Sequence, residues 1–235
     1  MLFSFEKALP IRIGDVSFRE TTIWNMPVTK IEKNSEFLFW GVWKIEESAE
    51  LLETIYTYDD EDRQDVMRTK HPAKRAERLS ARAILAKVTE ESGEKWNGLK
   101  KDTNGRPRLK GSDSDISITH AKGYAAAALT QQGKTGIDME RASAKVVRVR
   151  HKFLSQTESE MIGMDEMSLT AAWAAKEAIY KCSAIPGLEF KNEIIFEQFC
   201  PESKTYSLAS ARKTGPFRLS YQFIDDYVLC IATRA

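Results

Sequence analysis

Residues 136–140 constrain the fold more than any other short stretch, because their apolar and acidic side chains alternate strictly. A period of two is typical of a β-strand with one buried face. Ile137 and Met139 are therefore predicted to enter a core, while Asp138 and Glu140 project together from the opposite face. Two neighbouring carboxylates suit Mg²⁺, although a half-exposed strand with solvated acids produces the same pattern.

A helix is predicted over residues 169–182, where small and apolar side chains recur with helical spacing. Its predicted core stripe consists of Ala172, Ala175, Ile179 and Cys182. Its opposite side is predicted to carry Trp173, Lys176, Glu177, Tyr180 and Lys181. A tryptophan is seldom left fully solvated, so this side is expected to cover something. A surface ion pair between Glu177 and Lys181, four residues apart, is the alternative explanation of the charges.

The carboxylates of Asp138, Glu140 and Glu177, with lysines beside them, favour a divalent cation and a phosphate-rich ligand. Thr119 and His120 end a second alternating run, and the imidazole could donate a hydrogen bond to a phosphate oxygen. A single histidine at a strand end is more often structural. The three carboxylates therefore carry most of this interpretation.

Arginine side chains offer a second set of candidate phosphate ligands. Arg75, Arg78 and Arg82 share one face of a helix predicted over residues 72–89, and Arg106 lies on the turn that begins at residue 104. The guanidinium group binds phosphate through two parallel hydrogen bonds. A solvated helix face is the more common meaning of such a stripe, so the arginines alone do not define a site.

Composition limits the class of protein. The chain has 235 residues and a net charge of +1, which argues against a dedicated nucleic-acid binder. Its length allows one large domain or two small ones, and no apolar run is long enough to span a bilayer. Three widely spaced cysteines fit neither a disulfide framework nor a zinc site, and no signal-peptide pattern is evident. We therefore expect a cytoplasmic protein.

The predicted elements divide the chain at a polar, glycine-containing segment, residues 131–134. We expect one half at residues 1–132 and another at 133–235, each with strands and one principal helix. This arrangement is compatible with a duplicated α+β unit. Ser155 and Glu158 match a capping box and should start a further helix. The remaining predictions are a helix over 47–56, a strand over 36–45, and two short strands in 116–129 that break near residues 121–123. Strand-like runs are also predicted over 192–199 and 217–232.

The sequence resembles the 4′-phosphopantetheinyl transferases of the surfactin-synthetase-activating type. Four segments coincide in the order found in that family: NGRP at residues 104–107, SITH at 117–120, GIDME at 136–140, and a helix carrying Trp173, Lys176, Glu177 and Lys181. Two positions depart from the family pattern. Thr119 replaces the usual serine and keeps the hydroxyl, and Arg106 replaces a common lysine and keeps the charge.

The resemblance implies a pseudo-dimer of two similar α+β subdomains, with the active site in the cleft between them. It implies a holo-[acyl-carrier-protein] synthase reaction, in which the phosphopantetheine arm of coenzyme A moves to a carrier serine and adenosine 3′,5′-bisphosphate leaves. Asp138, Glu140 and Glu177 would hold Mg²⁺. Glu177 would also accept the serine proton, while Lys181, assisted by Lys176, would offset charge on the leaving phosphate. The implied coenzyme A ligands are Arg75, Arg82, Arg106, Thr119, His120, Asp138, Lys176 and Lys181.

The implied partner is an acyl or peptidyl carrier protein, and nucleic-acid or membrane partners are not expected. Residues 141–153 carry five Lys or Arg, one His and no acid, so they could meet the acidic helices of such a carrier. A chain with both halves should act as a monomer. One alternative is a metal-dependent phosphodiesterase or nuclease, which should have a broader basic surface. Another is a non-catalytic module, which leaves the carboxylates without a purpose.

Overall fold

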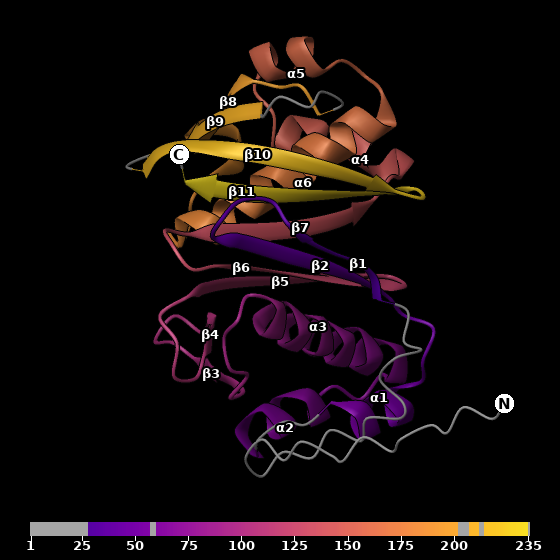
Figure 1. The fold of residues 1–235 in the computed structure, drawn as a ribbon. Helices are drawn as coiled ribbons and strands as arrows, with labels where there is room; N and C mark the ends of the chain where they lie inside the picture. The colour runs from indigo at the N-terminus through magenta and orange to yellow at the C-terminus, as the bar shows by residue number, and fades with distance from the viewer. Residues whose placement is uncertain (1–27, 57–59, 202–206, 212–213, 235) are drawn as a thin grey trace, which may run out of the picture.

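The computed structural model describes residues 28–56, 60–201, 207–211 and 214–234, which form two facing antiparallel sheets with helices outside them (Figure 1). Residues 1–27 lie outside this description. Among the described residues, no helix combines the length and apolar character needed to cross a membrane. The mixture of helices and antiparallel strands confirms the predicted α+β class.

The first sheet has the spatial order β1-β2-β6-β5. Its strands are β1 (Val28–Lys33), β2 (Leu38–Lys44), β5 (Asp115–Ala121) and β6 (Tyr124–Thr130). The helices on its outer side are α1 (Ala49–Ile55), α2 (Asp60–Met67) and α3 (Pro72–Glu91). A small hairpin consists of β3 (Leu99–Lys101) and β4 (Pro107–Leu109). The helix α3 begins at residue 72, as predicted, and proline occupies this first position, where its missing N–H is not needed.

The second sheet has the order β7-β11-β10-β9-β8. Its strands are β7 (Thr135–Arg141), β8 (Ile194–Gln198), β9 (Ser207–Ala211), β10 (Thr214–Ile224) and β11 (Tyr227–Arg234). Its helices are α4 (Ala144–Val149), the 3₁₀ turn η2 (Arg150–Lys152), α5 (Gln156–Ile162), α6 (Glu166–Ser183) and α7 (Phe190–Glu193). The capping box at the start of α5 is confirmed, because Ser155 and Glu158 each accept the other's backbone N–H.

Three apolar layers hold this arrangement together. One lies between α3 and the first sheet, and another lies between α6 and the second sheet. The third lies between the sheets and includes Trp40 and Val42 of β2 together with Ile137 and Met139 of β7. Ile137 and Met139 are buried, as their alternation with the acids predicted. The acids are thereby directed toward α6.

The two halves share part of their topology. In each, a strand is followed by the long helix and then by a hairpin whose second strand pairs with the first: β2, α3, β5 and β6, and later β7, α6, β10 and β11. Residues 131–134 connect β6 to β7. A true duplication, and the division at 132/133, remain predictions. One predicted strand was partly wrong, because 192–199 divides into α7 and β8.

Candidate active site

The site begins where β7 passes unusually close to α6. A Cβ atom on Gly136 would lie 2.0 Å from the carbonyl oxygen of Ala178 and 2.7 Å from the backbone nitrogen of Cys182. Only glycine allows this approach of strand and helix. The same face of β7 carries Asp138 and Glu140, so their carboxylates meet the side chains of α6 directly.

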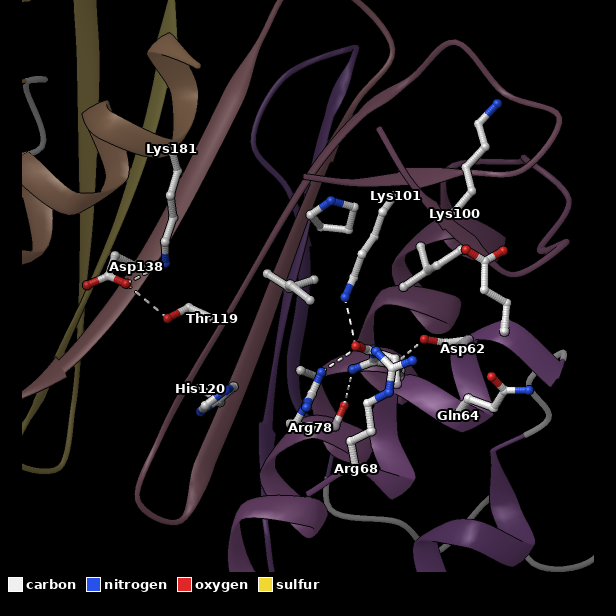
Figure 2. A pocket seen from close by; sticks show the side chains of 17 residues that line it. Asp62, Gln64, Arg68, Arg78, Lys100, Lys101, Thr119, His120, Asp138 and Lys181 are labelled. Atoms are coloured by element: carbon white, nitrogen blue, oxygen red, sulfur yellow. Dashed lines mark hydrogen bonds and ion pairs between the residues drawn. The ribbon is translucent and has the colours of Figure 1, made fainter. Parts of the chain in front are cut away.

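Asp138 joins three elements at the border of the two halves (Figure 2). Its Oδ1 accepts hydrogen bonds from Thr119 Oγ1 at 3.0 Å and from Lys181 Nζ at 2.6 Å. The side chains come from β5, β7 and α6. Asp138 is only 5% exposed, and its Oδ2 has no hydrogen-bond partner among the described residues. A buried carboxylate oxygen without a partner is costly, so Oδ2 is available to a ligand.

Two further carboxylates raise the negative charge of this region. Burial and the nearby charge of Asp138 raise the pKa of Glu140, whose Oε1 accepts a hydrogen bond from Trp173 Nε1 at 3.0 Å. Burial, and then repulsion from Asp138 and Glu140, raise the pKa of Glu177 to about 7, although Lys181 opposes the shift. Glu177 can therefore exchange a proton near neutral pH.

Trp173 covers a defined surface, as expected for a tryptophan opposite the core stripe. Its ring contacts Phe153 at a centroid distance of 5.0 Å and Phe190 at 5.4 Å. With its indole N–H on Glu140, it fixes that carboxylate beside α6. The side of α6 that carries Trp173, Glu177 and Lys181 thus faces the carboxylates of β7.

The predicted orientation of Lys176 is wrong. Its side chain is 0% exposed, and its ammonium group donates to Glu158 at 3.0 Å, to the carbonyl of Phe190 at 2.8 Å and to that of Ile194 at 2.7 Å. Three acceptors match its three protons. Lys176 therefore lies in the core of the second half, between α5, α6 and β8, and does not line the site.

The predicted metal ligands have suitable chemistry but do not form a complete cluster. Asp138, Glu140 and Glu177 are hard oxygen donors, and their mutual repulsion would be relieved by a cation. Within the described ranges, no group of three or more histidine, cysteine, aspartate or glutamate side chains is arranged to hold a metal ion. Mg²⁺ commonly uses only one or two carboxylates together with water and substrate phosphate. The donor set fits that mode.

A cavity of about 700 Å³ opens beside Asp138 (Figure 2). One wall carries Thr119, His120, Asp138 and Lys181, and the other is formed by α2, α3 and β3. Several cationic side chains line it: Arg68, Arg78, Arg82, Lys100, Lys101 and Lys181. A second cavity of about 350 Å³ shares Pro107, Ile118 and Lys181 with the first. Lys181 therefore lies where the two cavities meet.

His120 lies in the larger cavity with its imidazole 38% exposed, and its Nδ1 is 3.1 Å from Glu77 Oε2. The buried carboxylate of Glu77 also accepts from Lys74 Nζ at 2.7 Å. Partial burial lowers the pKa of His120, and the positive charges of Lys74 and Lys181 add to this, against the opposing effect of Glu77. The histidine is thus poised to gain a proton when a phosphate group binds nearby.

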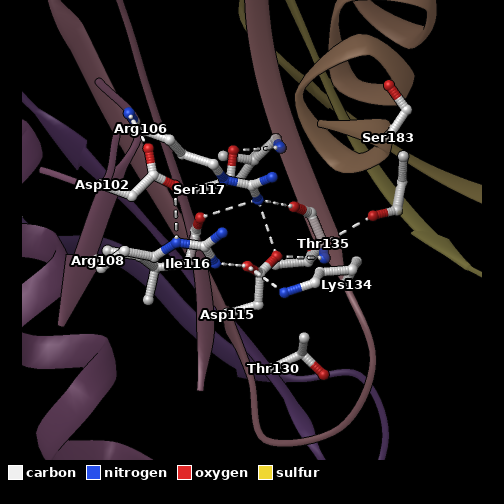
Figure 3. A network of polar contacts seen from close by, with 12 residues as sticks. Asp102, Arg106, Arg108, Asp115, Ile116, Ser117, Thr130, Lys134, Thr135 and Ser183 are labelled. Atoms are coloured by element: carbon white, nitrogen blue, oxygen red, sulfur yellow. Dashed lines mark hydrogen bonds and ion pairs between the residues drawn. The ribbon is translucent and has the colours of Figure 1, made fainter. Parts of the chain in front are cut away.

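The three predicted arginine ligands are all paired with carboxylates. Arg75 contacts Glu50 at 3.1 Å and Glu53 at 2.9 Å, outside the cavity lining. Arg82 lines the cavity and contacts two aspartates of α2. Arg106 Nη2 donates to Asp115 at 2.8 Å and to the carbonyl of Thr135 at 3.1 Å, which links the two halves (Figure 3).

The acids that hold these cations were not predicted as their partners from the sequence. Asp115 is 1% exposed and binds Arg106, Arg108 and Lys134, and its Oδ2 also accepts the backbone N–H of Thr135 (Figure 3). Glu77 and Glu158 have similar roles with His120 and Lys176. Only Glu158 had a local signal, the capping box. The others belong to contacts between residues that are distant in sequence or between elements.

Comparison with known proteins agrees with this geometry. Residues 134–232 match the family model described as the 4′-phosphopantetheinyl transferase superfamily. A comparison with curated proteins gave no match. The matched segment contains β7 with Asp138 and Glu140, and α6 with Glu177 and Lys181. Residues 134–232 therefore form a domain of the 4′-phosphopantetheinyl transferase superfamily.

Proposed function

We propose that the whole chain is a Mg²⁺-dependent transferase of the surfactin-synthetase-activating type. It moves phosphopantetheine from coenzyme A to a serine of an apo acyl or peptidyl carrier protein. The serine oxygen bonds to the phosphorus that carries the pantetheine, and the bond from this phosphorus to the bridging oxygen of the pyrophosphate breaks. Adenosine 3′,5′-bisphosphate leaves, and the proton of the serine passes to the enzyme.

The contact between Lys181 and Asp138 is the strongest support for this proposal. Lys181 contacts Asp138 at 2.6 Å at the rim of a cavity of about 700 Å³, within a transferase superfamily domain. The cavity is large enough for a nucleotide and is lined by cations on its far wall. A phosphate-rich substrate bound there would have its reacting phosphorus near the carboxylates of β7.

The residues of the chain supply the proton chemistry and the charge balance. Glu177, whose pKa of about 7 matches neutral conditions, accepts the serine proton. Lys181 neutralises charge that develops on the leaving phosphate. His120 and Thr119 are the predicted coenzyme A ligands that line the cavity beside Asp138. Arg82 acts mainly through the aspartates that it holds, because its guanidinium group is already paired. Arg106 lines the smaller cavity, and its Nη1 has no hydrogen-bond partner among the described residues, so this nitrogen can donate to the substrate.

Asp138 Oδ2, with Glu140 or Glu177, would hold Mg²⁺ on the pyrophosphate. When bound, the ion supplies polarisation of the phosphate oxygens and orients the groups that react. Because the three carboxylates do not form a ready cluster in the described residues, we propose that the substrate's own oxygens complete the coordination. Removing Mg²⁺ with a chelator is therefore expected to abolish transfer.

The basic segment 141–153 is proposed to receive the carrier. It forms α4 and η2, and the side chains of Lys145, Arg148 and Lys152 belong to this surface. An acidic carrier helix would be guided there by charge. The enzyme is proposed to act in the cytoplasm as a monomer that contains both walls of its cavity.

The test is direct: incubate the protein with coenzyme A, Mg²⁺ and apo carrier proteins, and weigh each carrier by mass spectrometry. A gain of one phosphopantetheine group per carrier supports the proposal, and Asp138→Ala and Glu177→Ala should each abolish it with the fold retained. No gain with fatty-acid, polyketide or peptide carriers would reject it. Cleavage of DNA or of a simple phosphodiester instead would favour the hydrolytic alternative.

A further inference from the structure

Three cationic side chains converge on one carboxylate inside the larger cavity. Asp65 of α2 accepts from Arg78 Nη2, from Arg82 Nη2 at 3.0 Å and from Lys101 Nζ at 2.7 Å (Figure 2). Arg78 and Arg82 belong to α3, and Lys101 belongs to β3. All four side chains line the cavity. The carboxylate that accepts hydrogen bonds from these three cations therefore lies at the wall of the cavity.

Two arginines and a lysine around one anion have the composition of a phosphate-binding site. Two guanidinium groups and one ammonium group surround a single small anion, and phosphate has the same preference for arginine forks with a lysine beside them. Burial raises the pKa of Asp65, but Lys101, Arg78 and Arg82 outweigh burial and lower it, so Asp65 stays ionised. Asp65 therefore neutralises one of the three positive charges with an anion of the protein itself.

Asp62, on the same helix, differs from Asp65 in its burial and in its partners. Asp62 is 4% exposed, and it accepts hydrogen bonds from Arg82 Nε at 2.7 Å and from Tyr56 Oη at 3.0 Å. It fixes α2 against the core. Asp65 is 17% exposed, and its partners among the described residues are three cations that line the cavity. Asp62 therefore serves the packing of α2, whereas Asp65 belongs to the cavity.

We propose that Asp65 is a resident anion that occupies the binding site for a phosphate monoester of the nucleotide substrate. The substrate's phosphate takes over the donors of Arg78, Arg82 and Lys101 as the carboxylate turns away. This inference rests on the proposed function, since it assigns the 3′-phosphate of coenzyme A as that monoester. The resident carboxylate lowers the affinity for the phosphate and so favours release of adenosine 3′,5′-bisphosphate after transfer.

The experiment compares Asp65→Asn with Glu61→Gln. Both residues line the cavity and both changes remove one negative charge from α2, but Glu61 is 70% exposed and pairs with Lys110 at the longer distance of 3.9 Å. Binding of adenosine 3′,5′-bisphosphate is measured by calorimetry, without a carrier. Asp65→Asn is expected to bind roughly 5-fold more tightly or better than the wild type. Glu61→Gln should change the affinity by less than about twofold, as an exposed charge does.

Dephospho-coenzyme A, which lacks the 3′-phosphate, serves as the matched ligand. Its affinity should be the same in Asp65→Asn and in the wild type, and a gain for both ligands would show a general charge effect and reject the proposal. Equal or weaker binding of the bisphosphate by Asp65→Asn would also overturn it, because Asp65 would then only position the cations. Thermal unfolding reports whether the variant is folded.

Lys101→Met gives a second test that does not depend on Asp65→Asn, because the Lys101 side chain is 53% exposed and not part of the core. It should weaken binding of the bisphosphate and spare dephospho-coenzyme A. Unchanged bisphosphate binding would reject the site. The carrier assay remains separate: transfer without these affinity changes would reject only the role of Asp65, whereas bisphosphate binding without transfer would reject the proposed reaction.

Discussion

Lys181 on α6 places its ammonium nitrogen 2.6 Å from Oδ1 of Asp138 on β7. The same nitrogen donates to the carbonyl oxygen of Ile137 at 3.0 Å, so the lysine joins helix and strand at two points. Its charge also opposes the rise in the pKa values of Glu140 and Glu177. One cation therefore pairs with Asp138 and also lowers the pKa values of the other two carboxylates.

Replacing this cation tests its place in catalysis. Lys181→Met should lower the rate of transfer by on the order of 10²-fold, because a charge aimed at the leaving phosphate is lost. The free energy of unfolding should also fall, because the buried Asp138 loses its cation, so the rates are compared under conditions in which the variant is folded. The measurement is kcat and KM for transfer to a carrier, with thermal unfolding in parallel. Lys181→Arg, which keeps the charge, should recover part of the rate, and equal rates in both variants would contradict this role.

Lys176 provides a matched comparison on the same helix. Lys176→Met leaves Glu158 buried without its cation, so the free energy of unfolding should fall by about 3 kcal/mol. The double variant Lys176→Met with Glu158→Gln should lose less, because no unpaired charge remains in the core. Urea unfolding measures both. A stable Lys176→Met protein that cannot transfer would instead place this lysine in the site, against its burial.

Part of this site was predictable because its signals are local. The alternation in 136–140 correctly predicted which face of β7 is buried, and the capping box at Ser155 correctly predicted the start of α5. Lys176 also had a local signal, since it lies four residues after Ala172 and three before Ile179. This spacing places it next to the core stripe, and its charge was wrongly given more weight than its position.

The partners of the arginines could not be predicted in this way. Arg75 pairs with Glu50, and Arg106 pairs with Asp115 and with the carbonyl of Thr135 in the other half. Each contact depends on how separate elements pack, and helical or strand periodicity carries no information about it. The arginine stripe indicated candidate phosphate ligands, but not which of their donors are already occupied.

The raised pKa of Glu177 gives a prediction about pH. The pKa of Glu177 is 4.5 in its ordinary state and about 7 in the fold, so the folded state favours the protonated acid. The resulting stabilisation is fully present below pH 4.5 and is lost as the pH rises through 7. Glu177→Gln removes this loss. At pH 8 the variant should exceed the wild type in unfolding free energy by on the order of 1 kcal/mol, after allowance for solvent screening.

The comparison is made by urea unfolding at pH 5 and pH 8 without divalent metal. The advantage of Glu177→Gln should shrink at the lower pH, and transfer by the variant should fall by about 10²-fold or more because the proton acceptor is lost. A stability difference that does not depend on pH would contradict the raised pKa. Full transfer activity in Glu177→Gln would show that another group accepts the serine proton.

Gly136 should control how accurately the two carboxylate-bearing elements are placed. In Gly136→Ala the new Cβ atom would lie 2.0 Å from the carbonyl oxygen of Ala178, so α6 must move away from β7. We expect a loss of about 1–3 kcal/mol in the free energy of unfolding, as in other overpacked cores. Gly215→Ala is the matched control, since Gly215 also lies in a strand of the same sheet and its Cβ would meet nothing within 4 Å.

Transfer should fall in Gly136→Ala even under conditions where the variant is fully folded, because a shift of helix against strand separates Lys181 and Glu177 from Asp138. If the folded variant kept full activity, the close approach at Gly136 would serve stability alone.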